Sequence, residues 1–209
     1  MAIPKSGYFI PNKYARTYLL SLQDVMGKNG VSAILNLAGL EAWADAYPAD
    51  NLEREVDFAD FSAIHAALEE MYGPRGGHGL ERRAGWTTYD ILLRSYRPVT
   101  GISGLLGRLL PGSTRVRYGL RLIARAFSHV SDQHCTVDED EEAFVYTVHR
   151  CPVCWGRLSE RPVCYTSIGL LEQSLRRLSG GQEFHVQETR CIARSDPACE
   201  FRITKQPIG

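Results

Sequence analysis

The fold of this chain is decided by one stretch near its carboxyl end, which reads CYTSIG at residues 164–169, FHVQETRC at 184–191 and DPACEFRI at 196–203. The last two segments alternate between apolar and polar residues, which predicts two β-strands. This alternation places Glu188 and Cys199 on faces that also carry apolar side chains. A buried carboxylate is costly unless it is paired or binds a metal ion.

Four side chains of this stretch, Cys164, Glu188, Cys191 and Cys199, are therefore predicted to converge on one metal ion. Three thiolate sulfurs and a carboxylate oxygen can bind zinc tetrahedrally, and Cys164 would reach the site from the start of a helix. Four protein ligands leave no open position, so the zinc would be structural and its binding would contribute to folding. The alternative is three reduced core cysteines beside a glutamate that binds the backbone or an arginine.

The same segments resemble the 4-vinyl reductase domain, a small-molecule-binding domain of bacteria and archaea, over about residues 144–205. This domain occurs in proteins linked to bacteriochlorophyll synthesis and in the sensor modules of phenol-responsive transcription activators. In those sensors a zinc ion is held by Cys, Glu, Cys and Cys at closely similar spacing, which maps onto the four residues named above. One departure is Ser195, since the family usually has glycine before the aspartate.

A second departure from the activator sensors is the extra pair Cys151-Pro-Val-Cys154. This spacing is typical of a metal knuckle or a redox pair. A second zinc would lack third and fourth ligands unless His149 and Cys135 join. Alternatively, the pair and the last two cysteines of the chain could bind a single zinc. The pair could also form a thiol-lined wall next to Trp155, facing a ligand cavity.

The order of the predicted elements indicates an α+β domain. Amphipathic patterns predict helices over residues 13–27, 31–46, 58–72, 80–96, 115–130 and 163–178, and strands over 135–138, 143–149 and the two terminal segments. Helices first and mostly antiparallel strands later are typical of this class. We divide the domain into a helical N-terminal part, residues 1–130, and a 4-vinyl reductase zinc-binding part, residues 131–209.

The resemblance also implies a fold and an oligomeric state. The fold would be the one shared by TRAPP vesicle-tethering subunits and heme-based nitric-oxide sensors, in which N-terminal helices pack on a twisted antiparallel sheet. Such domains often pair through their N-terminal helices, so a homodimer is expected.

Turn signals interrupt the helical part. Gly27 or Gly30 is expected to end the first helix, residues 48–56 are expected to form a loop, and GPRGGHG at 73–79 is expected to form a plain turn. The glycine-rich segment is not a phosphate loop, because no Lys-Ser/Thr follows it.

Bulk composition excludes several classes of protein. The 209 residues carry a formal net charge of +0, which does not indicate a nucleic-acid-binding surface. No apolar run approaches the roughly 20 residues needed to span a membrane, and the N-terminus lacks a signal-peptide core, so a cytoplasmic location is the default expectation. In that compartment six cysteines favour metal ligands or reduced thiols over disulfides.

Residues 91–131 contain seven arginines and no acid, and DEDEE follows at 138–142. The arginines are Arg94, Arg97, Arg108, Arg115, Arg117, Arg121 and Arg125. We expect a solvated arginine face partly neutralised by the acidic turn; the alternatives are an anion-binding wall or contact with a membrane surface or acidic partner. GLLGRLL at 104–110 is apolar enough for a lid, a peripheral membrane contact or a short buried helix.

These observations favour a small-molecule-binding domain of the sensor or carrier type. An apolar cavity between helices and sheet would hold a hydrophobic or aromatic ligand, and the arginines leave room for an acidic one. Trp86, Tyr89, Phe127 and Trp155 are the predicted lining residues. No Ser-His-Asp arrangement, HExxH motif or dinucleotide fingerprint occurs in the sequence, so no catalytic residues are predicted and an enzyme is less favoured.

Two alternative functions remain open at this point. The first is an accessory or reductase protein of (bacterio)chlorophyll synthesis that handles a vinyl tetrapyrrole. The second is a structural assembly subunit.

Overall fold

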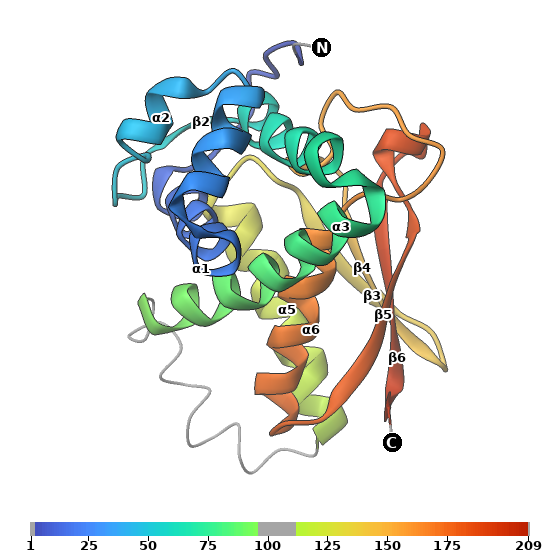
Figure 1. Cartoon of the computed structure of the whole chain (residues 1–209). Helices are drawn as coiled ribbons and strands as arrows, with labels where there is room; N and C mark the ends of the chain where they lie inside the picture. Colours follow the sequence, from blue (N-terminus) through green and yellow to red (C-terminus); the bar gives the residue numbers. More distant parts are fainter. Residues whose placement is uncertain (1–2, 96–111, 209) are drawn as a thin grey trace.

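A layer of helices covers one face of a four-stranded antiparallel sheet in the computed structural model, which describes residues 3–95 and 112–208 (Figure 1). The described helices are α1 (Asn12–Leu37), α2 (Glu41–Asp45), α3 (Phe58–Ser95), α5 (Gly112–Val130) and α6 (Tyr165–Ser179), with a short 3-10 turn at Ile192–Arg194. The strands are β1 (Phe9–Pro11), β2 (Arg54–Asp57), β3 (Cys135–Glu139), β4 (Ala143–Val148), β5 (Glu183–Arg190) and β6 (Cys199–Ile208). This arrangement confirms the predicted α+β class.

The main sheet has the strand order β3-β4-β6-β5, with every neighbouring pair antiparallel. Phe184, Val186 and Glu188 are buried while the residues between them are exposed, which confirms the predicted alternation in β5. Strand β6 lies between β4 and β5, and its register pairs Cys199 with Val148 at the end of β4. The register therefore brings the start of β6 next to the loop that follows β4, where Cys151 lies.

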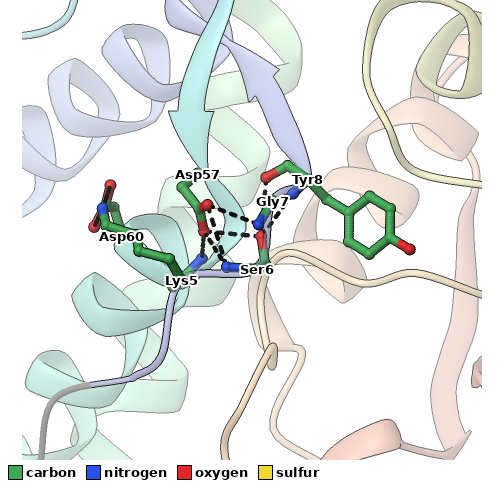
Figure 2. Close-up of polar contacts among 7 residues, drawn as sticks. Lys5, Ser6, Gly7, Tyr8, Asp57 and Asp60 are labelled. Atoms are coloured by element: carbon green, nitrogen blue, oxygen red, sulfur yellow. Dashed lines mark hydrogen bonds and ion pairs between the residues drawn. The ribbon is translucent and has the colours of Figure 1, made fainter.

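A second, two-stranded sheet pairs β1 with β2, and it corrects the expected loop over residues 48–56. Strand β2 ends at Asp57, directly before α3. The backbone N–H groups of Ser6, Gly7 and Ala59 donate to the Asp57 carboxylate at 3.0, 3.0 and 2.8 Å (Figure 2). Burial raises the pKa of Asp57, but the hydrogen bonds from Ser6, Ala59 and Gly7 outweigh it and hold the pKa below its usual value. Asp57 thus joins the N-terminal segment to the start of α3.

Glycines bend the two long helices. Gly27 in α1 and Gly73 in α3 have φ values of 79° and 68°, so each helix consists of two segments joined at a glycine. The predicted break at Gly27 is confirmed, but the turn expected over residues 73–79 is wrong beyond Gly73. Pro74 begins the next helical segment, where its fixed φ and missing N–H are tolerated.

The predicted helix over residues 31–46 is also corrected. Helix α1 ends at Leu37, Gly39 has a φ of 72°, and the short helix α2 follows. The left-handed glycine accounts for this break in the pattern.

Helices α3 and α6 lie in close contact because a glycine stands on each side of their crossing (Figure 1). A Cβ atom added to Gly169 of α6 would overlap the carbonyl oxygen of Arg82, and one added to Gly85 of α3 would overlap that of Thr166. The neighbouring atoms are backbone, so they cannot move aside without shifting a whole helix. These two glycines therefore set how deeply α6 sits against α3.

The predicted neutralisation of the arginine face is confirmed for part of α5. Glu139 at the end of β3 forms ion pairs with Arg117 at 2.8 Å, Arg121 at 3.7 Å and Lys205 at 3.0 Å. Arg97, Arg108 and the apolar segment 104–110 lie outside the described residues. Of the helices that the structure describes, none combines the length and apolar character needed to cross a membrane.

Candidate metal centre and ligand cavity

Five cysteine sulfurs and one glutamate carboxylate converge in the interior at one end of the main sheet. They are Cys151 and Cys154 from the loop after β4, Cys164 at the N-terminal cap of α6, Glu188 from β5, and Cys191 and Cys199 on either side of the turn before β6. The five cysteines are fully buried and the glutamate is 5% exposed. Residues that are distant along the chain are therefore gathered by one loop, one helix cap and two strand ends.

The distances between the sulfurs suit coordination of a metal ion. The Cys164 sulfur lies 3.7 Å from that of Cys151, 3.9 Å from that of Cys191 and 3.8 Å from that of Cys199. The sulfurs of Cys154 and Cys199 are 3.4 Å apart. Zinc–sulfur bonds of about 2.3 Å correspond to a tetrahedral edge of about 3.8 Å. The cluster is thus already close to the size that tetrahedral thiolate ligation requires.

The donors form two groups of four in which all ligand atoms lie within 4.8 Å of one another. One group is the predicted set, Cys164, Glu188, Cys191 and Cys199. The other is Cys151, Cys154, Cys164 and Cys199, in which Cys164 takes the place that the competing sequence hypothesis gave to Cys191.

The two further candidate ligands from the sequence belong to neither group. The ring of His149 stacks on His134 with centroids 4.7 Å apart, and its Nε2 lies 3.1 Å from the Thr136 hydroxyl. The backbone N–H of Cys135 donates to Ser128 at 2.9 Å, while burial raises the pKa of the Cys135 thiol to about 12. Cys135 is therefore a buried thiol outside the cluster.

Glu188 provides the observation that best tests whether a cation fits. Its Oε2 accepts the backbone N–H of Cys164 at 2.8 Å, whereas its Oε1 is buried without a hydrogen-bond partner. Burial, followed by the nearby Cys191 sulfur, raises the pKa of Glu188 to about 9. A divalent cation among these donors would occupy the unpartnered oxygen and favour the ionised carboxylate. The residues therefore fit a metal ion.

Backbone N–H groups also point at the sulfurs. Ile192 donates to the Cys199 sulfur at 3.3 Å, and Val153 and Val163 donate to the sulfurs of Cys151 and Cys191. Hydrogen bonds to a charged form favour that form, and thiolate is the form that binds metals. This arrangement is suited to holding several thiolates in the interior.

The turn between β5 and β6 explains the departure at Ser195. Ser195 has a φ of 70°, the left-handed conformation in which glycine is favoured. Next to it, Asp196 accepts the backbone N–H of Cys191 at 2.8 Å. The turn thus keeps the conformation that suits glycine, although this chain has serine.

A small cavity of about 30 Å³ lies between the helices and the sheet. Its lining residues come from α1, α5, the segment before β3, β4 and α6, and are Tyr14, Phe127, Gln133, Tyr146, Val148, Ser167, Leu170 and Leu171. Aromatic and aliphatic groups dominate, and the polar groups are hydroxyls and one amide. No charged side chain is among these lining residues.

Of the four side chains predicted to line a ligand cavity, Phe127 borders this one. Trp86 is 38% exposed and donates its indole N–H to Glu172 at 2.9 Å. Trp155 packs against Tyr8 with ring centroids 5.5 Å apart, and Tyr89 packs partly buried against the core. Sequence reasoning missed Tyr14, Gln133 and Ser167, since no periodic signal distinguishes them from neighbouring core positions.

A further feature that the sequence did not reveal is a buried polar cluster in the helical layer. The Nδ1 of His65 lies 3.2 Å from both the Tyr18 hydroxyl and a Glu81 carboxylate oxygen, and all three residues are fully buried. Thr166 at the start of α6 donates to the Tyr18 hydroxyl at 3.2 Å. This cluster links α1, α3 and α6 away from solvent.

Comparisons with known proteins agree with this geometry. Residues 144–205 match the family model of the 4-vinyl reductase (4VR) domain. The search of curated proteins found no match.

Solved structures with the same fold are H-NOX proteins. A variant of Tt H-NOX is 16% identical with a TM-score of 0.61, and the match covers 96% of this chain and 97% of that one. The Fe(II) unliganded H-NOX protein from K. algicida is 13% identical, with a TM-score of 0.61 and the same coverage. An H-NOX protein from S. oneidensis in the Fe(II)NO ligation state is 12% identical, with a TM-score of 0.55 and coverage of 93% and 99%. The chain therefore carries a match to the 4-vinyl reductase domain, the family that its motifs resemble, within a domain that has the H-NOX fold.

Proposed function

We propose that this chain is a small-molecule-binding domain of the sensor or carrier type, braced by a structural zinc ion. The observation that carries the proposal is that α6 belongs to both candidate sites. Its cap residue Cys164 lies in the donor cluster, and Ser167, Leu170 and Leu171 border the cavity within the next two turns. An ion at the cluster would fix the start of the helix that forms one cavity wall.

For the zinc, the proposed ligands are Cys164, Glu188, Cys191 and Cys199. Three features support this set: sulfur separations of 3.8 and 3.9 Å, the unpartnered Glu188 oxygen, and backbone N–H groups directed at the thiols. Four protein ligands saturate a tetrahedral ion, which suits a role in stability rather than in catalysis. When bound, the ion would connect α6, β5 and β6.

For the ligand, the uncharged lining favours a hydrophobic or aromatic compound that carries a single hydroxyl or carbonyl group. Drug-sized ligands occupy pockets of about 300–1,000 Å³. A cavity of about 30 Å³ must therefore enlarge on binding. Tyr14 and Phe127, which contact each other edge to face at 5.6 Å, are the side chains we expect to separate.

An acidic ligand would find a different surface. Arg121 and Arg125 line an open groove of about 290 Å³ between α5 and β3, together with Cys135, Thr136 and Val137. The two guanidinium groups offer the positive charge that the interior cavity lacks. A carboxylate-bearing compound is therefore expected in this groove rather than in the cavity.

The small cavity volume favours one second candidate, a structural assembly subunit without a ligand. The two candidates differ in what stabilises the protein, because a ligand that binds only the native state raises the melting temperature. Native mass spectrometry with metal analysis would report zinc content, the expected homodimer and any co-purifying compound together. A panel of phenols, short fatty acids and a porphyrin would then be screened by thermal shift.

Variants assign any stabilising compound to the cavity. Ser167→Leu fills the space and is expected to abolish the thermal shift while zinc content is unchanged. Tyr146→Phe removes a buried hydroxyl from the lining and should weaken binding, whereas Tyr118→Phe removes an exposed hydroxyl and should not. Unchanged binding in Ser167→Leu would exclude the cavity as the site. No stabilising compound, with a stable protein complex in its place, would favour the assembly subunit.

A further inference from the structure

We propose that the donor cluster holds two metal ions, with the sulfurs of Cys164 and Cys199 bridging them. The first ion would use the four ligands of the proposed function, on which this inference rests. The second ion would take Cys151 and Cys154 as its terminal ligands and share the two bridging sulfurs. This arrangement supplies the third and fourth ligands that the sequence alone does not identify for the Cys151-Pro-Val-Cys154 pair.

Overlap of the two donor groups is the main observation. Each group has four members, and both contain Cys164 and Cys199. Two tetrahedral ions that share an edge need six donors in total, and the cluster contains six. The shared edge is the separation of the bridging sulfurs, 3.8 Å, which equals the edge expected for zinc–sulfur bonds of about 2.3 Å.

A single ion leaves part of the cluster unexplained whichever group it occupies. If it binds the four cysteines of the second group, Glu188 keeps a buried oxygen without a partner. If it binds the predicted group, Cys151 and Cys154 remain as buried thiols, 3.7 and 3.4 Å from the sulfurs of Cys164 and Cys199. Two ions engage every donor.

Charge points in the same direction. Five thiolates and one carboxylate carry six negative charges, so one divalent ion offsets two of them and a second offsets two more. Among the residues that the structure describes, no lysine, arginine or histidine forms an ion pair with these donors. Like charges repel strongly in a low-dielectric interior, which favours a second cation once the thiols ionise. Soft thiolate ligands of this kind select zinc among the common divalent ions.

The strand register explains why the second ligand pair is available. Pairing of Val148 with Cys199 holds the end of β4 beside the start of β6. The chain then needs only three residues to bring Cys151 back to the cluster. The backbone N–H of Val153 donates to the Cys151 sulfur, as is expected for a knuckle that presents a thiolate.

Metal stoichiometry is the first test, measured by elemental analysis and native mass spectrometry on the full chain. Wild type is expected to hold two zinc ions per chain, and Cys151→Ser/Cys154→Ser is expected to hold one. Cys135→Ser removes a buried cysteine outside both groups and should keep two. One zinc in wild type and in the double variant would overturn the second ion but leave the proposed function intact. No zinc in wild type would overturn both.

Bridging is tested on the wild-type chain, so the result does not depend on whether a variant folds. The protein is loaded with ¹¹³Cd and its metal–proton correlations are recorded by NMR. Two cadmium signals are expected, with the β-protons of Cys164 and Cys199 correlated to both. A single signal, or two signals that share no cysteine, would overturn the bridged arrangement.

Discussion

Ser195 shows, at the scale of one residue, how the turn before β6 holds its conformation. An L-residue in the left-handed region costs about 1–2 kcal/mol, and glycine avoids most of this cost. Ser195→Gly is therefore expected to raise the free energy of unfolding by about 0.5–1 kcal/mol, measured by urea unfolding of zinc-loaded protein. Ser195→Val, which is β-branched, should lower it. Equal stabilities for the two variants would show that the turn does not depend on this φ value.

Asp57 makes a pH-dependent contribution at the same scale. Its carboxylate accepts three backbone N–H groups, so Asp57→Asn is expected to cost about 1–2 kcal/mol at pH 7. The pKa of Asp57 is lower in the folded state than its usual value, so this stability is present above the unfolded pKa and is lost as pH falls through the folded one. Wild type and variant should converge in stability below about pH 3.

The control for this prediction is Asp60→Asn, which removes only the exposed ion pair with Lys5. It should have a smaller effect at pH 7. A gap between wild type and Asp57→Asn that stays constant down to acid pH would contradict the assignment.

At the scale of elements, the crossing of α3 and α6 depends on Gly169. Gly169→Ala would place a methyl group on the Arg82 carbonyl and force the helices apart, at a cost of about 1–3 kcal/mol. Because α6 begins next to Cys164, the variant should also bind zinc more weakly in a chelator competition. Gly79→Ala is the matched control, since a Cβ there meets nothing within 4 Å. Wild-type stability and zinc affinity in Gly169→Ala would contradict the role of the crossing.

The elements also show what a sequence can and cannot predict. Strands β5 and β6 are predictable because each buries one face, which produces a period of two around Glu188 and Cys199. Strands β1 and β2 are not, because three- and four-residue strands leave no periodic signal. The turn expected at 73–79 extends too far, because Pro74 at a helix start and packing outweigh local glycine chemistry.

The same distinction applies to the candidate sites. The first ligand group can be predicted because its members are close in sequence or match a family spacing. The second group depends on the pairing of β4 with β6, which is a non-local property. The cavity lining, except for Phe127, could not be predicted for the same reason.

For the whole molecule, zinc is expected to stabilise one end more than the other. The donor cluster joins α6, β5 and β6, whereas α1 and α3 pack around a separate aromatic core that includes Tyr18 and Phe61. Removal of zinc by a chelator should therefore increase hydrogen exchange in residues 151–199 by roughly tenfold or more and affect α1 little. Uniform deprotection of the chain would indicate instead that zinc holds the entire fold.

X-ray absorption at the zinc K-edge of the purified protein tests the central claim most directly, since it reports the atoms bound to the ion. The account predicts a first shell dominated by sulfur at about 2.3 Å, with a minor oxygen contribution from Glu188. A first shell of nitrogen and oxygen alone would contradict it.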